Sequence, residues 1–282
     1  MRISTSVVPK RLRNISQPPK TLFVRGAALE ELLERPCVTI VGSRKISAYG
    51  KAVTAMLAGE LARRGVVIIS GLALGVDSIA HRAALDAGGL TIAVLPAGLD
   101  RVYPAGHRAL AEQIAAQGGA LVTECPPLSN IYKGSFIARN RISAGLGDAL
   151  LITEAAVKSG TLHTANFALE QGRPVLAVPG NITSPTSGGT NNLIKSGATP
   201  VTGVDDILHI LGLSAGQHAK QAPRSSDPHE QALLDLLVAG VSNGAELLAQ
   251  SQLAVSLFNQ TLTMLEIRGQ IRALGGNHWG LQ

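Results

Sequence analysis

The chain has 282 residues, of which 45% are hydrophobic and 16% are charged, and its formal net charge is +6. A chain of this length can bury a core without disulfides or metals, and this composition excludes an intrinsically disordered polymer. Aromatic residues make up only 3% of the sequence, which disfavours a nucleic-acid binder that stacks bases on aromatic platforms, so any nucleic acid is expected to be held by its phosphates.

The N-terminal segment, residues 1–20, is basic, and residues 1–29 contain six Lys and Arg residues and no acid. No apolar segment follows these charges, so a signal peptide is not predicted, and no apolar run reaches the roughly 18 residues of a membrane span. Cys37 and Cys125 fit no metal-binding spacing and are expected to be reduced thiols. We therefore expect a cytoplasmic protein with no membrane contact.

From residue 38 onward, short apolar runs alternate with amphipathic stretches. Apolar runs bounded by glycines are typical of buried strands. In the stretches between these runs, apolar residues recur with a period of about 3.6 residues, which is typical of helices. This alternation predicts an α/β domain over residues 21–213, with a Rossmann-like, doubly wound, mostly parallel sheet covered on both faces. The predicted strands are 38–41, 66–69, 91–95, 120–123, 149–153 and 174–178, and the predicted helices are 48–64, 77–87, 109–117 and 162–171.

Glycine-containing loops follow four of these strands, at residues 42–44, 70–75, 96–98 and 179–180. In a parallel sheet the carboxyl ends of the strands lie at one edge, and ligands bind outside that edge. The sequence therefore predicts where the functional edge lies before it predicts the function.

Beyond residue 213 the composition changes. Residues 214–228 are rich in Ser, Gln, Ala, Pro and Lys and are predicted to form a linker. In residues 229–282, helices at 231–237, 245–250 and 255–268 precede strands at 270–274 and 278–281, a pattern typical of a small winged-helix-like domain. This segment has two arginines, Arg268 and Arg272, against four acidic residues. Its role therefore stays open between DNA binding, partner binding and a structural cap.

Three short motifs combine glycine or hydroxyl groups with cations. Glycine allows close backbone approach to a phosphate, and amides and arginine forks donate to its oxygens. For each motif the alternative is an ordinary turn, a cap or a solvated cation. The motifs are Gly42-Ser43-Arg44, the Arg139-Asn140-Arg141 cluster and Lys158-Ser159-Gly160 before a helix, and Lys195 is a further cation expected at the same edge.

A catalytic set is not found in the sequence. The seven histidines show no zinc-ligand spacing, and neither a serine nucleophile elbow nor a phosphate-binding Walker loop is present. Asp77 and His81 are four residues apart and are interpreted as a structural capping pair. We therefore expect a non-enzymatic protein without metal or cofactor.

Taken together and in this order, the motifs resemble those of the DprA/Smf family of DNA-processing proteins over about residues 20–212. The matching strings are Ile40-Val41-Gly42-Ser43-Arg44 with Tyr49-Gly50, Ser70-Gly71-Leu72-Ala73 with Gly75-Val76-Asp77 and Ala80-His81, Gly98-Leu99-Asp100 with Tyr103-Pro104, Arg139-Asn140-Arg141, Lys158-Ser159-Gly160, Glu170 with Gly172-Arg173, Val178-Pro179-Gly180, and Asn192-Leu193-Ile194 with Gly197-Ala198.

This resemblance implies a homodimeric protein that binds single-stranded DNA without catalysis. It also implies protection of incoming strands and loading of the RecA recombinase during natural transformation and DNA recombination. By the same resemblance, Arg44 is the main phosphate contact, with Gly42, Ser43, Lys158 and Lys195 near it.

The sequence departs from the family pattern at two positions. Leu74 stands where a basic residue is usual, which puts one phosphate contact in doubt, and His107 stands where asparagine is common. Two competing hypotheses remain. One is a nucleotide-binding or nucleotide-hydrolysing enzyme of a related Rossmann-like fold, faintly suggested by Ser159-Gly160-Thr161 with Glu170, and the other is a scaffold whose C-terminal domain recruits a partner.

Overall fold

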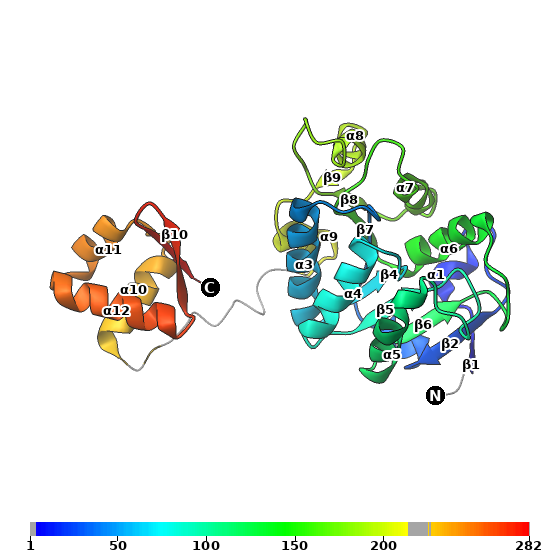
Figure 1. Ribbon diagram of the computed structural model, residues 1–282, viewed down its shortest axis with the longest axis horizontal. Helices are drawn as coiled ribbons and strands as arrows, with labels where there is room; N and C mark the ends of the chain where they lie inside the picture. The colour runs from blue at the N-terminus through cyan, green and yellow to red at the C-terminus, as the bar shows by residue number, and fades with distance from the viewer. Residues whose placement is uncertain (1–3, 214–224, 226, 282) are drawn as a thin grey trace. The chain divides into compact units, whose positions relative to one another are not determined.

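The computed structural model describes residues 4–213, 225 and 227–281. The chain divides into two compact units, Met1–Ser214 and Ala215–Gln282 (Figure 1). Most of the predicted linker at 214–228 lies outside the described residues. The boundaries predicted for the basic segment, the linker and the two domains stay predictions.

Among the described residues of the first unit, nine strands form one sheet in the order β1-β2-β6-β5-β4-β3-β7-β8-β9. Pairing is parallel from β6 to β9, and β1 and β2 add an antiparallel edge. The Rossmann-like, mostly parallel sheet is thus confirmed. The strands are β1 Ser4–Ser6, β2 Leu22–Gly26, β3 Cys37–Val41, β4 Val67–Ser70, β5 Thr91–Val94, β6 Ala120–Thr123, β7 Ala149–Ile152, β8 Val175–Ala177 and β9 Thr199–Pro200.

The chain winds outward from β3 in both directions. From β3 it proceeds through β4 and β5 to β6, and it then returns to the other side of β3 with β7, β8 and β9. The order reverses between β3 and β7, and in open α/β sheets the loops that follow two such strands enclose the ligand crevice. Both strands are entirely buried, as continuous apolar runs in the middle of such a sheet must be.

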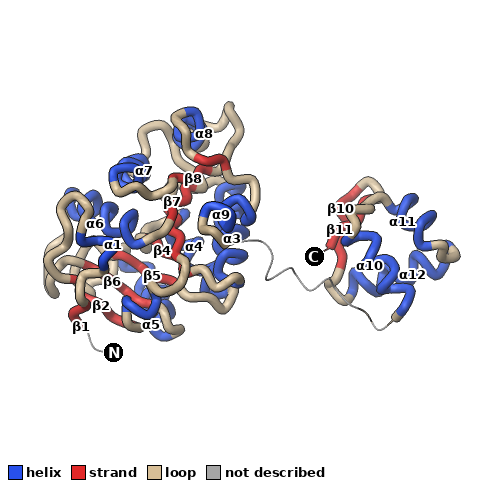
Figure 2. The backbone as a smooth tube through the Cα atoms, turned by 180° about the vertical axis from the view of Figure 1, so that it is seen from behind, coloured by secondary structure: helices blue, strands red, loops and turns tan. Residues whose placement is uncertain are grey.

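Helices cover both faces of the sheet (Figures 1 and 2). The packing clusters place α3, α4, α5 and α9 on one face and α1, α2, α6 and α7 on the other. The helices are α1 Lys10–Arg13, α2 Leu29–Leu32, α3 Ala48–Arg63, α4 Val76–Asp86, α5 Arg108–Ala116, α6 Lys133–Leu146, α7 Thr161–Glu170, α8 Gly188–Lys195 and α9 Val204–Ile210.

The described part of the basic N-terminal segment packs on the first unit. The β1 strand pairs with β2, and Leu12 of α1 is fully buried in the core that α6 covers. Arg11 reinforces this docking, because its guanidinium donates to the carbonyl of Leu33 at 3.3 Å and pairs with Asp148 at 3.2 Å. Alternation alone could not predict the two N-terminal strands, because one has three residues and the other is interrupted by a charge.

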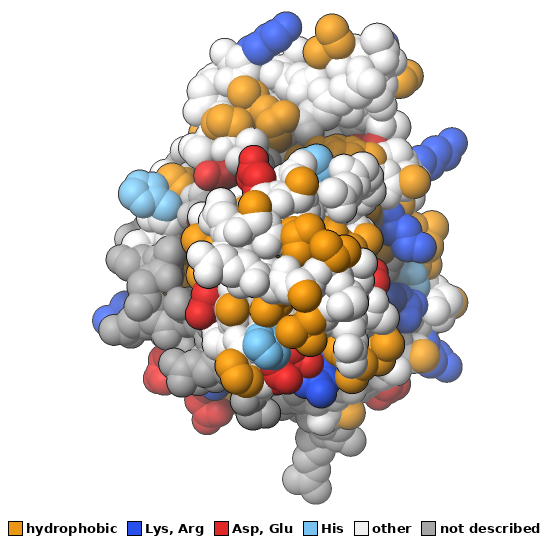
Figure 3. Space-filling model, turned by 90° about the vertical axis from the view of Figure 1, so that its left-hand side faces the viewer, with side chains coloured by type: hydrophobic (Ala, Val, Ile, Leu, Met, Phe, Trp, Pro, Cys, Tyr) orange, Lys and Arg blue, Asp and Glu red, His pale blue; other side chains and the backbone are white. Residues whose placement is uncertain are grey.

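The C-terminal unit has the predicted winged-helix pattern. Helices α10 (Pro228–Val238), α11 (Gly244–Ser251) and α12 (Val255–Ile267) precede the hairpin of β10 (Ile271–Gly275) and β11 (His278–Leu281). Side chains of Asp227 and Asn243 cap the first two helices. Figure 3 shows hydrophobic side chains gathered in the middle of the face turned to the viewer, with acidic side chains among them and Lys and Arg side chains mainly toward its edges.

Candidate functional site

The loop that follows β3, residues 42–47 (the Arg44 loop), lies at the switch point of the sheet and is anchored to the end of β7. The Ser43 amide donates to the carbonyl of Glu154 at 2.8 Å, and the Ser47 amide donates to its carboxylate at 2.9 Å. A Cβ on Gly42 would lie 2.5 Å from Val76 and 2.8 Å from the Glu154 carbonyl. Only glycine therefore fits where this loop passes between α4 and β7.

Arg44 is exposed and is placed by an aromatic side chain. Its guanidinium carbon lies 5.1 Å from the ring centroid of Phe136 on α6, and that ring meets Tyr103 edge-on at 5.4 Å. A cation over an aromatic face is attracted to it and loses rotational freedom there. Arg44 thus presents a partly ordered fork to solvent, and the exposed Lys45 adds a second cation.

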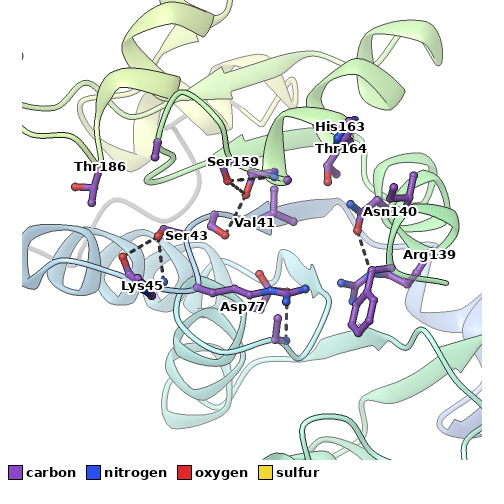
Figure 4. Close-up of a pocket in the computed structure, with 18 residues that line it drawn as sticks. Val41, Ser43, Lys45, Asp77, Arg139, Asn140, Ser159, His163, Thr164 and Thr186 are labelled. Atoms are coloured by element: carbon purple, nitrogen blue, oxygen red, sulfur yellow. Dashed lines mark hydrogen bonds between the residues drawn. The ribbon is translucent and has the colours of Figure 1, made fainter. Parts of the chain in front are cut away.

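A second loop approaches the Arg44 loop from the start of α7. The hydroxyl of Thr161 donates to the carbonyl of Gly42 at 3.1 Å, and Ser159 donates to the Thr161 hydroxyl at 2.9 Å. Gly160 is the N-cap residue of α7, and the amides of this helix end carry partial positive charge. The exposed Lys158 precedes them. Figure 4 shows Ser159 beside the backbone that carries Val41 and Ser43.

These loops enclose a cavity of about 810 Å³. The predicted site residues along its wall are Gly42, Ser43, Arg44, Arg139, Asn140, Ser159 and Gly160, and residues from β3, α4, α6 and α7 all contribute. Lys158 adjoins the wall through Ser159 but is not part of it. Lys195 is exposed in the last turn of α8, outside the cavity lining.

The two arginines of the predicted 139–141 cluster are bound by the protein itself. Arg139 is only 6% exposed and donates to the carbonyls of Gly71 at 2.6 Å and Val94 at 2.7 Å. Arg141 is 7% exposed and makes two bonds of 2.7 Å to the Glu124 carboxylate. Their neighbour Asn140 is half-buried and accepts from the Nε of Arg139 at 3.2 Å.

Asp77 and His81 lie on α4 but bond to different partners. The Asp77 carboxylate accepts from the amides of Gly71 at 3.1 Å and Ala73 at 3.3 Å, and burial raises its pKa despite the nearby Arg139. His81 Nδ1 lies 2.6 Å from the Thr91 hydroxyl, and burial lowers the pKa of His81 to about 3. Both residues are therefore structural, as expected, but they do not form a pair.

Two site features could not be identified from the sequence. Glu154 and Phe136 follow no motif with a known mechanism, and their importance lies in contacts with the Arg44 loop across more than ninety residues. The one available signal for Phe136 was its rarity, since the chain has four phenylalanines. Glu154 directly follows the end of a predicted strand, which marked its position but not its partner.

Within residues 4–213 and 227–281, no group of three or more His, Cys, Asp or Glu side chains could hold a metal ion. Cys37 and Cys125 are free thiols, and burial raises the pKa of Cys37 to about 12. None of the helices in the described ranges is long and apolar enough to cross a membrane.

Two family models match the chain. The model for DNA recombination-mediator protein A covers residues 2–212, and the model for the DprA winged helix domain covers residues 217–277. Among curated relatives, a putative DNA processing protein DprA from Mycobacterium tuberculosis is 44% identical over 76% of this chain and 54% of its own length. Protein Smf of Escherichia coli is 44% identical over 77% of this chain and 58% of its own length. The chain thus spans a little over half the length of these two relatives.

Solved structures of two similar proteins share this fold. DNA processing protein A from Helicobacter pylori, described for its single-stranded DNA binding mode, has a TM-score of 0.68 and 36% identity, covering 74% of this chain and 95% of that one. DprA from Streptococcus pneumoniae has a TM-score of 0.69 and 38% identity, covering 74% of both chains.

Proposed function

This chain belongs to the DNA recombination-mediator protein A family, the DprA/Smf proteins, and we propose that it binds single-stranded DNA by its phosphates at the cavity between β3 and β7. The observation that carries the proposal is the meeting of the glycine-bearing Arg44 loop with the first turn of α7, where the Thr161 hydroxyl donates to the Gly42 carbonyl. Arg44, Lys45 and Lys158 place three exposed cations around this junction. Helix N-termini and arginine forks both favour phosphate oxygens.

The geometry supports phosphate recognition more than base recognition. Phe136 is the one Phe, Tyr or Trp residue along the cavity wall, and Arg44 already lies over its ring. A row of stacking platforms is therefore not available among the residues that line the cavity. Contacts to phosphates carry little sequence information, so binding is expected to tolerate any sequence.

The site residues fall into three groups under this proposal. Gly42, Ser43, Arg44, Ser159 and Gly160 form the wall against which the phosphate lies. Arg44 supplies the charged donor, because the hydroxyls of Ser43 and Ser159 already donate to Lys45 and Thr161. Lys158 and Lys195 lie outside the cavity lining and act on the strand as it leaves the cavity. Arg139 and Arg141 give their donors to the protein, and the neighbouring Asn140 keeps its amide N–H₂ group for the strand.

The family description and the resemblance together support a wider role. The protein is proposed to act in the cytoplasm as a homodimer, without catalysis, protecting single strands and delivering them to the RecA recombinase in transformation or another recombination pathway. Light scattering in solution tests the dimer. A strand-exchange assay with purified recombinase tests delivery, and no stimulation by this protein would reject that part of the proposal.

The test of DNA binding compares a single-stranded oligonucleotide with its duplex by fluorescence anisotropy over a salt series. Preferential single-strand binding is expected, with log affinity falling linearly by about 0.7 per phosphate contact for each log unit of salt. Equal affinity for the duplex, or salt-independent binding, would reject the proposal. Incubation with a nucleoside monophosphate panel tests the hydrolase alternative, and no released base or ribose phosphate is expected.

A further inference from the structure

A buried acid and a buried base lie side by side in the wall of the cavity. Asp77 is 5% exposed in the first turn of α4, and Arg139 is 6% exposed on α6. Both residues line the cavity, as Figure 4 shows, yet the carboxylate would repel a phosphate and the guanidinium is already bonded. Neither residue is therefore explained by direct phosphate contact.

Both side chains hold the loop that follows β4, residues 70–75. Asp77 accepts from the amides of Gly71 and Ala73, while Arg139 donates to the Gly71 carbonyl at 2.6 Å. Gly71 is thus fixed through both of its backbone polar groups. A Cβ at this position would lie 1.9 Å from the Arg139 Nη1, so the close approach requires glycine.

The 70–75 loop in turn supports the backbone of the Arg44 loop. Val76 begins α4 directly after this loop, and its amide donates to the carbonyl of Ser43 at 3.2 Å. A Cβ on Gly75 would lie 2.2 Å from the Ser43 carbonyl oxygen and 2.8 Å from that of Arg44. Because the two loops are in backbone contact, a shift of residues 71–75 displaces the residues that carry the proposed phosphate donors.

We propose that Asp77 and Arg139 are positioning residues for phosphate binding, which hold the Arg44 loop in place through the 70–75 loop. This inference rests on the proposed DNA binding. A carboxylate near an anion site opposes binding by its charge but favours it by its hydrogen bonds, so its two effects have opposite signs.

The test measures single-stranded DNA affinity by anisotropy for Asp77→Ala, Asp77→Asn and Arg139→Lys. Asp77→Ala removes the charge and the acceptor together, and we expect weaker binding by about tenfold or more, which corresponds to about 1.4 kcal/mol. Asp77→Asn removes the charge but keeps an oxygen for the two amides, so binding is expected to equal or exceed that of the unmodified protein. Arg139→Lys keeps the charge but loses the paired backbone bonds, and weaker binding is expected.

The matched control is Asp86→Ala, which removes an exposed acid from the last turn of the same helix and should leave affinity unchanged. Thermal unfolding shows which variants are folded. If Asp77→Ala does not fold, the affinities of Asp77→Asn and Arg139→Lys test the proposal. Tighter or unchanged binding in folded Asp77→Ala, loss of binding in Asp77→Asn, or full binding in Arg139→Lys would overturn the proposal. Arg44→Ala distinguishes failure of the positioning role from failure of the proposed DNA site. If Arg44→Ala weakens binding but the Asp77 and Arg139 variants do not, the DNA site stands and only the positioning role is rejected.

Discussion

Replacing Arg44 with alanine removes the exposed guanidinium over Phe136 and leaves the fold unchanged. Among the described residues, the hydrogen bonds that hold the Arg44 loop do not involve this side chain. The amides of Ser43 and Ser47 donate to Glu154, the Thr161 hydroxyl donates to the Gly42 carbonyl, and the Val76 amide donates to the Ser43 carbonyl. The variant is therefore expected to keep the unfolding temperature of the unmodified protein while losing affinity for single-stranded DNA.

The size of the loss follows from the contact removed. A hydrogen bond to a charged group contributes about 1.5–3 kcal/mol, so one Arg44–phosphate contact corresponds to roughly a 10- to 150-fold change in affinity. Losing one phosphate contact also lowers the slope of log affinity against log salt by about 0.7. Arg44→Lys keeps a charge but lacks the bidentate fork, so its affinity is expected to lie between that of the unmodified protein and that of Arg44→Ala.

The assay is fluorescence anisotropy with a labelled oligothymidylate over a salt series. The matched control is Arg82→Ala, which removes an exposed arginine from α4 outside the cavity lining. An Arg44→Ala variant that binds as tightly as Arg82→Ala, or that loses affinity with no change in salt slope, would refute the phosphate contact.

Three further predictions concern the rim, the N-terminal segment and a buried histidine. Leu74→Lys places a cation at an exposed position beside the Arg44 loop and should tighten single-strand binding and steepen the salt slope by about 0.7; an unchanged slope would exclude a phosphate there. Leu12→Ala empties a fully buried position and should lower the free energy of unfolding by about 2–5 kcal/mol in urea titration, whereas Val7→Ala, at 71% exposure, should change it by less than about 0.5 kcal/mol. His81 is neutral and buried, and its pKa is lowered to about 3 from 6.5 in the unfolded chain. Its contribution to stability is therefore complete above pH 6.5 and declines as the pH falls toward 3. Between about pH 7 and 5 the free energy of unfolding should fall by about 2 kcal/mol on this account. Urea unfolding of His81→Gln should show a smaller decline over this interval, and an equal decline would assign it to other groups.

The sequence-based predictions agree best with the structure where a feature depends only on one strand and the loop that follows it. The run before Gly42-Ser43-Arg44 is apolar, the glycine is followed by donors, and both facts hold without any distant contact. Agreement was poorer for other helices. Helix α6 was not predicted because its 14 residues are rich in small and polar side chains. Four short helices were also not predicted: α1 and α2 with four residues each, α8 with eight and α9 with seven.

The arginine cluster shows why the composition of a motif does not decide its role. Arg139 and Arg141 have the residue type expected for phosphate contact. They are two positions apart on a helix, however, and residues at that spacing point to different sides. One meets the 70–75 loop and the other meets Glu124, which come from separate parts of the chain. Burial converts both from ligand donors into internal supports, and no local pattern predicts which acceptors the fold will bring to them.

The sequence by itself determined the parallel sheet, the edge at which its loops gather and the glycine-bearing loop that carries Arg44. These features depend on residue spacing and on the steric freedom of glycine, which are local properties. Only the tertiary structure decided that Glu154 anchors this loop, that Phe136 places Arg44 and that Asp77 and Arg139 hold the neighbouring loop. Such contacts join residues far apart in the chain, and they exist only because the sheet order brings β3, β4 and β7 next to one another.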